Sequence, residues 1–193
     1  MPTFVIVGHR VRTDDDFSLN DLPGSTGRLD VLLRCVNSAF MLSNDIRKDV
    51  DVYLVLLGEP DPPRTVHFKG GGLKYLNPDE RSTGALVKKA LAEKVWSEET
   101  GVAPGVFVSK RGLAEVLGDN PGRLVYLREG GNDVREVALS NDDVFVLGGH
   151  EDLTSEEEAI IQDGRETLRV SLGLKSLHAD HCITLVLNEL DRL

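Results

Sequence analysis

Continuous hydrophobic runs alternate with segments of helical periodicity along the whole chain. The runs that predict buried strands lie at residues 2–8, 51–58, 123–128, 143–147 and 168–172, and residues 105–109 predict a short strand. Apolar residues spaced three and four apart predict helices at residues 28–47, 78–93, 110–117 and 177–193, and another that opens at Thr154. Ser176 occupies the N-cap position expected for the last helix. This alternation is typical of an α/β fold with a mostly parallel sheet covered by helices on both faces.

The segments between these elements carry weaker patterns. Residues 64–69 alternate polar and apolar, which predicts a short exposed strand or hairpin arm, and residues 134–139 predict a small hairpin arm. Residues 14–25 and 101–104 are expected to be loops, the first because it is rich in Asp, Asn, Pro and Gly. No internal repeat, low-complexity segment or linker interrupts the chain, so one domain over residues 1–193 is expected.

Two predicted strands close to each other in sequence end in glycine turns. Gly148-Gly149-His150 ends one strand, and Gly173 links the next strand to the last helix. Ligands of open α/β sheets bind outside the carboxyl ends of the strands, and a helix N-terminus adds free backbone N–H groups there. Apolar walls with such backbone groups suit adenosine, so a small-molecule pocket is expected at these turns.

Composition limits the function classes. Hydrophobic residues make up 40% of the 193 residues, and no apolar run approaches the roughly 18 residues that a membrane span requires. Two widely separated cysteines favour a reducing cytoplasm over a disulfide scaffold. The net charge is -10, whereas nucleic-acid binders usually carry a basic excess. A nucleic-acid site would therefore have to be a local basic patch on an acidic, or salt-adapted, surface.

Metal and nucleophilic chemistry are not indicated. The five histidines are scattered, and neither an H-E-x-x-H motif nor paired cysteines are present, so no metal site is predicted. His178 and Cys182 are four residues apart on a predicted helix, but two ligands alone make a poor metal site. To act as a nucleophile, Cys182 would need a thiol with a lowered pKa that a substrate can reach. A simpler interpretation is that Cys182 lines an apolar wall.

Three segments carry a resemblance to a known family. The C-terminal one has Ser-Leu-Gly at 171–173, Leu-His-Ala-Asp at 177–180, Cys-Ile at 182–183 and Asn-Glu-Leu-Asp-Arg at 188–192. The N-terminal one has Gly-Arg-Leu-Asp-Val at 27–31, Arg-Cys at 34–35, Ser-Ala-Phe at 38–40 and Asp-Ile-Arg at 45–47, and the middle one has Val-His-Phe at 66–68 before a Gly-Gly pair. Together they resemble the archaeal-type tRNA pseudouridine-54 N1-methyltransferases, which belong to the SPOUT superfamily of knotted methyltransferases.

The resemblance implies a SPOUT fold with a C-terminal trefoil knot, a homodimer, and S-adenosylmethionine held in the knot, at about residues 123–193. Backbone groups would hold the adenine and ribose. The cofactor contacts that the family pattern implies are Leu127, Gly148, Gly149, Ser171, Leu172, Gly173, Leu174, Lys175, Ser176, Leu177, Cys182 and Ile183.

The implied reaction is methyl transfer to N1 of a pseudouridine in the TΨC arm of tRNA. The proton on N1 needs an acceptor, and Asp30 is the candidate base, with Arg28 beside it to favour the anionic ring or hold phosphate. Candidate phosphate contacts are Arg10, Arg12 and Arg34. Three alternatives stay open: N1-methylation of a ribosomal-RNA pseudouridine, a non-catalytic RNA-binding protein with the same fold, and an unrelated small-molecule α/β enzyme.

Overall fold

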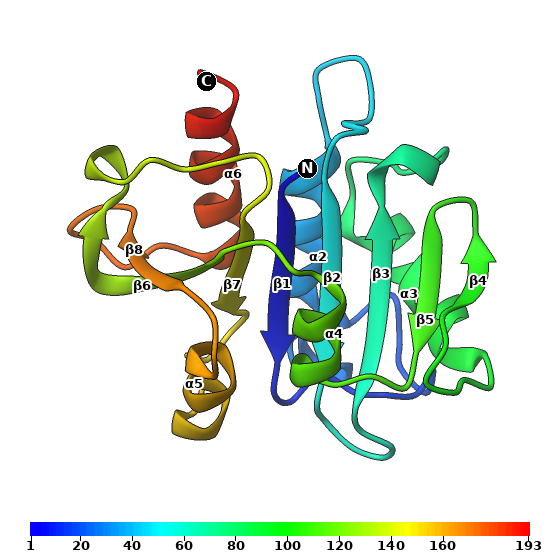
Figure 1. Ribbon diagram of the computed structural model, residues 1–193. Helices are drawn as coiled ribbons and strands as arrows, with labels where there is room; N and C mark the ends of the chain where they lie inside the picture. The colour runs from blue at the N-terminus through cyan, green and yellow to red at the C-terminus, as the bar shows by residue number, and fades with distance from the viewer.

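A single eight-stranded sheet forms the centre of the molecule, in the order β4-β5-β3-β2-β1-β7-β6-β8 (Figure 1). The structure is a computed structural model and describes residues 1–193. The strands are β1 (Thr3–Gly8), β2 (Asp51–Leu56), β3 (Arg64–Lys69), β4 (Thr100–Ala103), β5 (Val106–Ser109), β6 (Leu124–Asp133), β7 (Val144–Gly148) and β8 (Thr167–Ser171). Strands β2, β1, β7, β6 and β8 pair in parallel, whereas β3, β5 and β4 add antiparallel. The predicted α/β fold with a mostly parallel sheet is confirmed.

Six α-helices and two short 3-10 helices connect the strands. The helices are α1 (Leu22–Ser25), α2 (Leu29–Phe40), α3 (Glu80–Ala92), α4 (Leu113–Asp119), α5 (Ser155–Gln162) and α6 (Ala179–Leu190), with η1 (Gly70–Gly72) and η2 (Val134–Glu136). The helix predicted to open at Thr154 is α5, where Thr154 and Glu157 cap each other's backbone N–H groups. The reciprocal cap satisfies two amides that a helix start otherwise leaves unpaired.

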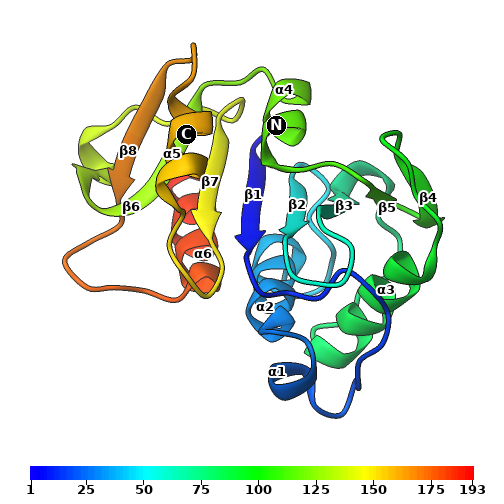
Figure 2. The same cartoon turned by 90° about the horizontal axis from the view of Figure 1, so that it is seen from below.

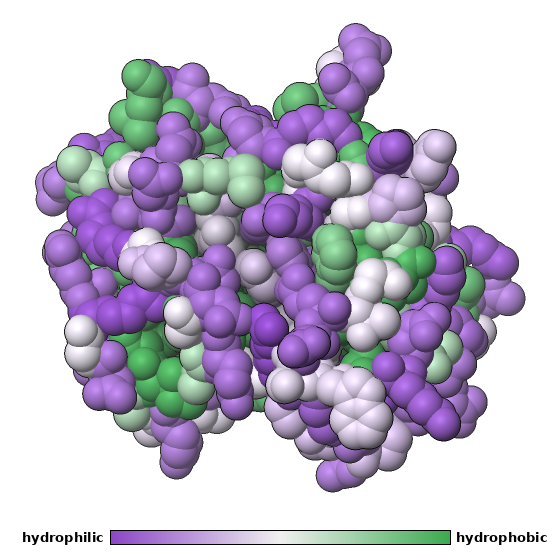
Figure 3. Space-filling model, turned by 45° about the vertical axis from the view of Figure 1, so that its right-hand side comes forward, coloured by the Kyte–Doolittle hydropathy of each residue, from purple (hydrophilic) through white to green (hydrophobic).

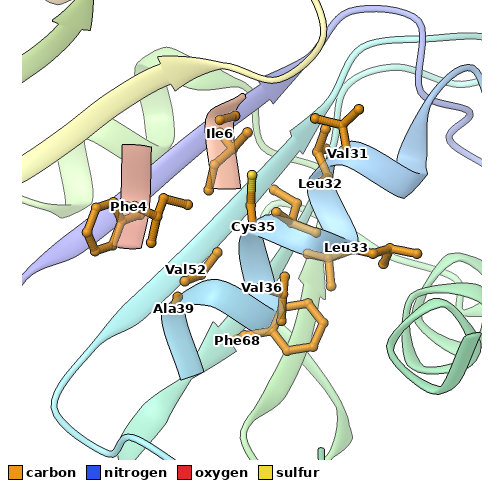
Figure 4. Packing of buried hydrophobic residues seen from close by; sticks show 14 of the residues in the cluster. Phe4, Ile6, Val31, Leu32, Leu33, Cys35, Val36, Ala39, Val52 and Phe68 are labelled. Atoms are coloured by element: carbon orange, nitrogen blue, oxygen red, sulfur yellow. The ribbon is translucent and has the colours of Figure 1, made fainter. Parts of the chain in front are cut away.

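Strand β1 supplies side chains to two hydrophobic cores. Phe4 and Ile6 belong to the larger core, with residues of α2, α3 and α6, whereas Val5 and Val7 belong to a smaller one with residues of α4 and α5. This alternation follows from the two-residue period of a strand. Figure 2 shows α2, α3 and α6 on one side of the row of strands and α4 on the other. Figure 4 shows the apolar stripe of α2, including Leu32 and Val36, pointing at the strands.

Several strand predictions were wrong in burial or extent. β3 is buried rather than exposed, because β2 and β5 pair with it on both sides. β8 lies at the sheet edge, and only Val170 of it is buried, so the prediction of a buried strand there was wrong. Residues 100–103 form β4 instead of a loop, and residues 134–136 form η2 instead of a hairpin arm.

Helix ends also differ from the sequence prediction. α2 stops at Phe40, and Met41 and Ile46 then form an isolated antiparallel bridge within the stretch predicted to be helical. The short α1 lies inside the segment expected to be a loop. α6 begins after His178, so Ser176 is not its N-cap.

The surface carries the charge that the composition indicated. Figure 3 shows a face that is mostly hydrophilic, with hydrophobic side chains in separate smaller areas. None of the helices combines the length and the apolarity that crossing a membrane would require.

Beyond Leu127, β6 continues as a segment that returns to β8. Val170 is aligned first with Leu127 and then again with Asn132, across an irregularity in the β6–β8 ladder. The return is close: a Cβ on Gly131 would lie 2.6 Å from the backbone carbonyl carbon of Arg169. Only glycine fits here, and the close approach fixes this segment beside the start of the C-terminal chain.

Candidate functional site

A cleft opens at the carboxyl ends of β6, β7 and β8, under the loop that leads into α6. It has a volume of about 750 Å³ including the space open to solvent. We call it the cofactor cleft; its lining residues are Leu127, Arg128, Glu129, Leu147, Gly148, Gly149, His150, Glu151, Asp152, Val170, Ser171, Leu172, Gly173, Lys175, Ser176, Leu177, Ala179 and Cys182. This is the edge of the sheet at which the sequence predicted a pocket.

All but two of the predicted cofactor contacts line this cleft. The exceptions are Leu174, whose side chain is fully exposed, and Ile183, which is fully buried in the larger core. Five charged or titratable lining residues were not among the predicted contacts: Arg128, Glu129, His150, Glu151 and Asp152. The one sequence feature that could have indicated these residues is their position, because each of them follows the buried part of β6 or β7.

The loop into α6, part of which lines the cleft, leaves backbone donors unpaired. The N–H groups of residues 174–178 donate no hydrogen bond within the chain. Gly148 permits the tight turn opposite, because a Cβ there would lie 2.0 Å from the backbone oxygen of Glu151. Unpaired donors around an apolar floor match the polar edge and flat ring of an adenine base.

The rim of the cleft carries both signs of charge. Acidic Glu129, Glu151 and Asp152 and basic Arg128 and Lys175 all belong to its lining. A zwitterionic ligand with an extra positive centre, such as the amino-acid end of S-adenosylmethionine, finds partners of both signs here. The residues present therefore fit this cofactor.

Cys182 belongs to the cleft wall. Burial, with Asp180 and Glu129 nearby, raises the pKa of its thiol to about 11. The thiol is therefore neutral near pH 7 and serves as an apolar surface rather than as a nucleophile.

A second cavity adjoins the cofactor cleft. We call it the side cavity; it is lined by Arg28, Val31, Gly149, His150, Ser176, Leu177, His178 and Ala179. Arg28 brings a guanidinium to it from the N-terminus of α2. Its backbone φ is 77°, and it is the only non-glycine residue in the left-handed region. Such a conformation costs about 1 kcal/mol or more and recurs at functional sites.

Asp30 holds this arginine in place. Its Oδ1 accepts from Arg28 Nε at 3.0 Å, and its Oδ2 accepts from Arg28 Nη2 at 3.2 Å and from Arg34 Nη1 at 3.1 Å. Burial acts to raise the pKa of Asp30, but the hydrogen bonds and charges of both arginines outweigh it and lower that pKa. The carboxylate is only 4% exposed and lines neither the cofactor cleft nor the side cavity. This placement favours support of Arg28 over the base role expected from sequence.

The three candidate phosphate contacts differ in availability. The Arg10 side chain is 71% exposed and pairs with Glu151 at 2.5 Å near the site. Arg12 is held by Asp14 at 2.7 Å, and Arg34 is held by Asp30 and Glu80. Of the three, the structure brings Arg10 next to the cleft, while the other two are bound to carboxylates of the same chain.

The structure contains no cluster of three or more His, Cys, Asp or Glu side chains arranged to hold a metal ion. His178 lines the side cavity and Cys182 lines the cofactor cleft. His178 contacts His181 edge-on, with ring centroids 5.8 Å apart.

Comparisons with known proteins identify the family of the chain. The model of the family described as "Putative SAM-dependent RNA methyltransferase" matches residues 1–193. The tRNA (pseudouridine(54)-N(1))-methyltransferase of Methanocella arvoryzae is 50% identical over 193 residues, covering 100% of both chains. The protein of the same name from Methanococcoides burtonii is 50% identical over 196 residues, covering 100% of this chain and 96% of its own.

A solved structure shares the fold. The crystal structure of Archaeoglobus fulgidus Nep1 bound to S-adenosylhomocysteine superposes with a TM-score of 0.65 at 17% sequence identity, covering 99% of this chain and 97% of that one. The family model matches the whole chain, and relatives of full length are 50% identical to it. The protein belongs to the SAM-dependent RNA methyltransferase family that includes the tRNA (pseudouridine(54)-N(1))-methyltransferases.

Proposed function

We propose that the protein transfers a methyl group from S-adenosylmethionine to N1 of pseudouridine-54 in the TΨC arm of tRNA. The observation that carries this proposal is the cofactor cleft with the Arg28-lined side cavity directly beside it. Relatives that are 50% identical over the whole chain carry the corresponding name. A donor and an acceptor held in adjoining cavities need only be aligned, and positioning is the main demand of methyl transfer.

S-adenosylmethionine would lie in the cofactor cleft. The sulfonium of the bound cofactor supplies an already activated methyl group. Of the predicted contacts, we assign cofactor binding to those that line the cleft: Leu127, Gly148, Gly149, Ser171, Leu172, Gly173, Lys175, Ser176, Leu177 and Cys182. Leu174 contributes through its free backbone N–H, and Ile183 supports the wall from the core.

The C-terminal third would form the trefoil knot of a SPOUT fold. Support comes from the β6 segment that returns to Val170 and from the close contact of Gly131 with β8. The chain of residues 172–178 then runs past this crossing into α6. The knotted path of the chain would fix the conformation of residues 172–178 without the need for side-chain hydrogen bonds.

The active form would be a homodimer with tRNA as its macromolecular substrate. Exposed leucines beside the cleft mouth support a second copy: Leu174 is fully exposed and Leu177 is 38% exposed. The position of Arg28 in the side cavity is evidence for a contact with the target nucleotide. The exposed Arg10 beside Glu151 is evidence for a phosphate contact at the edge of the site. The two cysteines are free thiols, which supports the predicted cytoplasmic location.

The test is transfer of labelled methyl from S-adenosylmethionine to two tRNA transcripts. One transcript carries pseudouridine at position 54 and the other carries uridine there. We expect label only on the pseudouridine transcript, because uridine has no nitrogen at the methylated position. Cofactor affinity is measured separately by calorimetry.

A cleft-filling variant ties the activity to the proposed site. Ser176→Trp would place an indole in the cofactor cleft and should abolish both cofactor binding and transfer. Ser97→Trp is the matched control, since Ser97 is exposed in a loop and lines neither cavity. If the protein binds the cofactor but labels neither transcript, the proposal is contradicted. The remaining candidates are then a ribosomal-RNA substrate and a non-catalytic role.

A further inference from the structure

One histidine stands where three cavities meet. Besides the cofactor cleft and the side cavity, a smaller pocket lies against the end of β1 and the start of α2. We call it the β1 pocket; its lining residues are Gly8, His9, Arg10, Val11, Gly27, Arg28, Leu32, His150 and Glu151. His150 is the only residue that lines all three.

The side cavity is the place for a group that reacts with the cofactor. It shares Gly149, His150, Ser176, Leu177 and Ala179 with the cofactor cleft, so a ring in one lies against a ligand in the other. Arg28 also lines the side cavity, and guanidinium donors suit the carbonyl oxygens of a uracil ring. His150 lies at the boundary between the two spaces.

The imidazole of His150 is exposed and makes no hydrogen bond within the chain. Three other titratable groups near it, Glu151, His9 and Asp30, are held by partners within the chain. Glu151 pairs with Arg10 at 2.5 Å, and His9 Nε2 lies 2.8 Å from Glu157 Oε2. Asp30 is buried between Arg28 and Arg34. An imidazole without a hydrogen-bond partner in the chain has a ring nitrogen available to accept a proton from a bound substrate.

We propose that His150 is the catalytic base that accepts the N1 proton of the target pseudouridine, an inference that rests on the proposed function above. The N1–H proton passes to a ring nitrogen of His150. The N1 lone pair forms the new N–C bond, the S–C bond of the donor breaks with its electron pair on sulfur, and S-adenosylhomocysteine results. The imidazolium then releases its proton to solvent. Arg28 stabilises the negative charge that develops on the ring carbonyls.

The charged and titratable groups that line the cavities around His150 come from several elements. Arg28 belongs to the start of α2, and Arg10 and His9 belong to the segment after β1. The remaining ones are Arg128, Glu129, Glu151, Asp152, Lys175 and His178. Any pH dependence assigned to His150 must therefore be separated from theirs by substitution.

The first measurement is the single-turnover methylation rate as a function of pH. His150→Gln keeps a polar side chain of similar size but cannot accept a proton, and we expect a loss of about 100-fold or more. Cofactor affinity should stay within about threefold. The fall in rate toward acid pH should disappear in this variant, and free imidazole should restore part of the rate of His150→Ala.

Two comparison variants separate His150 from its neighbours. His181→Gln is the matched control: His181 lies in the first turn of α6, is exposed, and lines none of the three cavities. It should retain the wild-type rate. Glu151→Gln tests one rival carboxylate. This variant should lower the rate far less than His150→Gln, because Glu151 is already bound to Arg10.

A readout without the methyl donor tests the contact itself. Ring nitrogens of His150, assigned by the resonances missing in His150→Gln, are followed by NMR as a T-arm RNA hairpin is added. A hairpin with pseudouridine-54 should shift them much more than one with uridine-54, whose matching ring edge presents C–H instead of N–H.

The outcomes are distinct. An active wild type with His150→Gln within threefold of its rate, or with Glu151→Gln as the inactive variant, overturns the role of His150. A wild type that methylates neither tRNA transcript contradicts the proposed function instead. In that case the NMR comparison still decides whether His150 meets N1, and equal shifts with both hairpins would refute the contact.

Discussion

Replacing Asp30 by asparagine tests whether this carboxylate holds Arg28 in place. The substitution keeps size and shape but removes the charge that two guanidiniums bind at 3.0–3.2 Å. Asp30 lines neither the cofactor cleft nor the side cavity, so cofactor affinity should not change. The rate of methyl transfer should fall, because Arg28 would lose the bonds that fix its guanidinium in the side cavity.

The stability cost can be estimated from the contacts. Breaking a buried ion pair by removing one partner costs about 3–5 kcal/mol. Here the two arginines keep alternatives, since the Arg28 side chain is 35% exposed and Arg34 also pairs with Glu80 at 3.2 Å. Asparagine also retains an acceptor oxygen. We therefore expect the free energy of unfolding at pH 7 to drop by about 2–3 kcal/mol.

The pH dependence of this loss has a definite sign. The folded-state pKa of Asp30 is lowered, so its contribution to stability is fully present above the unfolded-state value of about 3.9. It is lost as pH falls through the lower folded-state pKa. The difference between wild type and Asp30→Asn should therefore be largest near pH 7 and shrink below about pH 4.

Urea unfolding at a series of pH values measures this difference. Asp16→Asn is the matched control, because Asp16 is 94% exposed and lies 3.8 Å from Arg12, so it should change stability by less than about 0.5 kcal/mol. A loss for Asp30→Asn no larger than that of Asp16→Asn, or one that stays constant down to pH 3.5, would refute the ion-pair reasoning. An unchanged methylation rate would refute the support of Arg28.

Three further predictions address the fold and the cleft. Gly131→Ala would bring a Cβ to 2.6 Å from the backbone of β8, so cofactor affinity by calorimetry should fall by at least about tenfold, whereas Gly118→Ala, with nothing within 4 Å, should leave it unchanged. Phe145→Ala removes a fully buried ring stacked on another at 5.1 Å and should cost about 3–5 kcal/mol in urea unfolding; a loss below about 1 kcal/mol would contradict the close packing. Because the pKa of Cys182 is raised to about 11, its alkylation by iodoacetamide should be slow at pH 7.5, rise roughly tenfold per pH unit up to that value, and be slowed by bound cofactor. Fast alkylation at pH 7.5 would show that the thiol is not in this environment.

The continuous apolar runs located β1, β2 and β7 and, with the helical periodicities, the α/β class. These strands are buried on both faces, so their hydrophobicity is a local property that needs no knowledge of neighbours. The Gly148-Gly149 and Gly173 turns located the cofactor cleft for a similar reason. Backbone geometry at a strand end depends on the residue that stands there, and the ends of parallel strands meet at one edge.

Position within the sheet was decided only by tertiary structure. β3 alternates like a half-exposed strand, yet β5 and β4 extend the sheet beyond it and bury it. Leu168, Val170 and Leu172 give the β8 region apolar positions that predicted a buried strand, yet β8 is an edge strand and nothing pairs with its outer edge. Whether a strand is central or at the edge depends on which other segments pair with it, and this is non-local information.

For the site residues, too, the sequence determines one part of the chemistry and the tertiary structure the other. Sequence indicated that Arg28 and Asp30 belong together, because they lie at a helix start beside a glycine-rich loop. Only the folded chain shows that the carboxylate is buried under two guanidiniums while Arg28 reaches the side cavity. Only the fold brings three cavities together at His150, and this position singles it out among the five histidines. Residue type and spacing fix which groups are near a strand end, whereas burial and partners, which set their protonation and reach, depend on segments far apart in the chain.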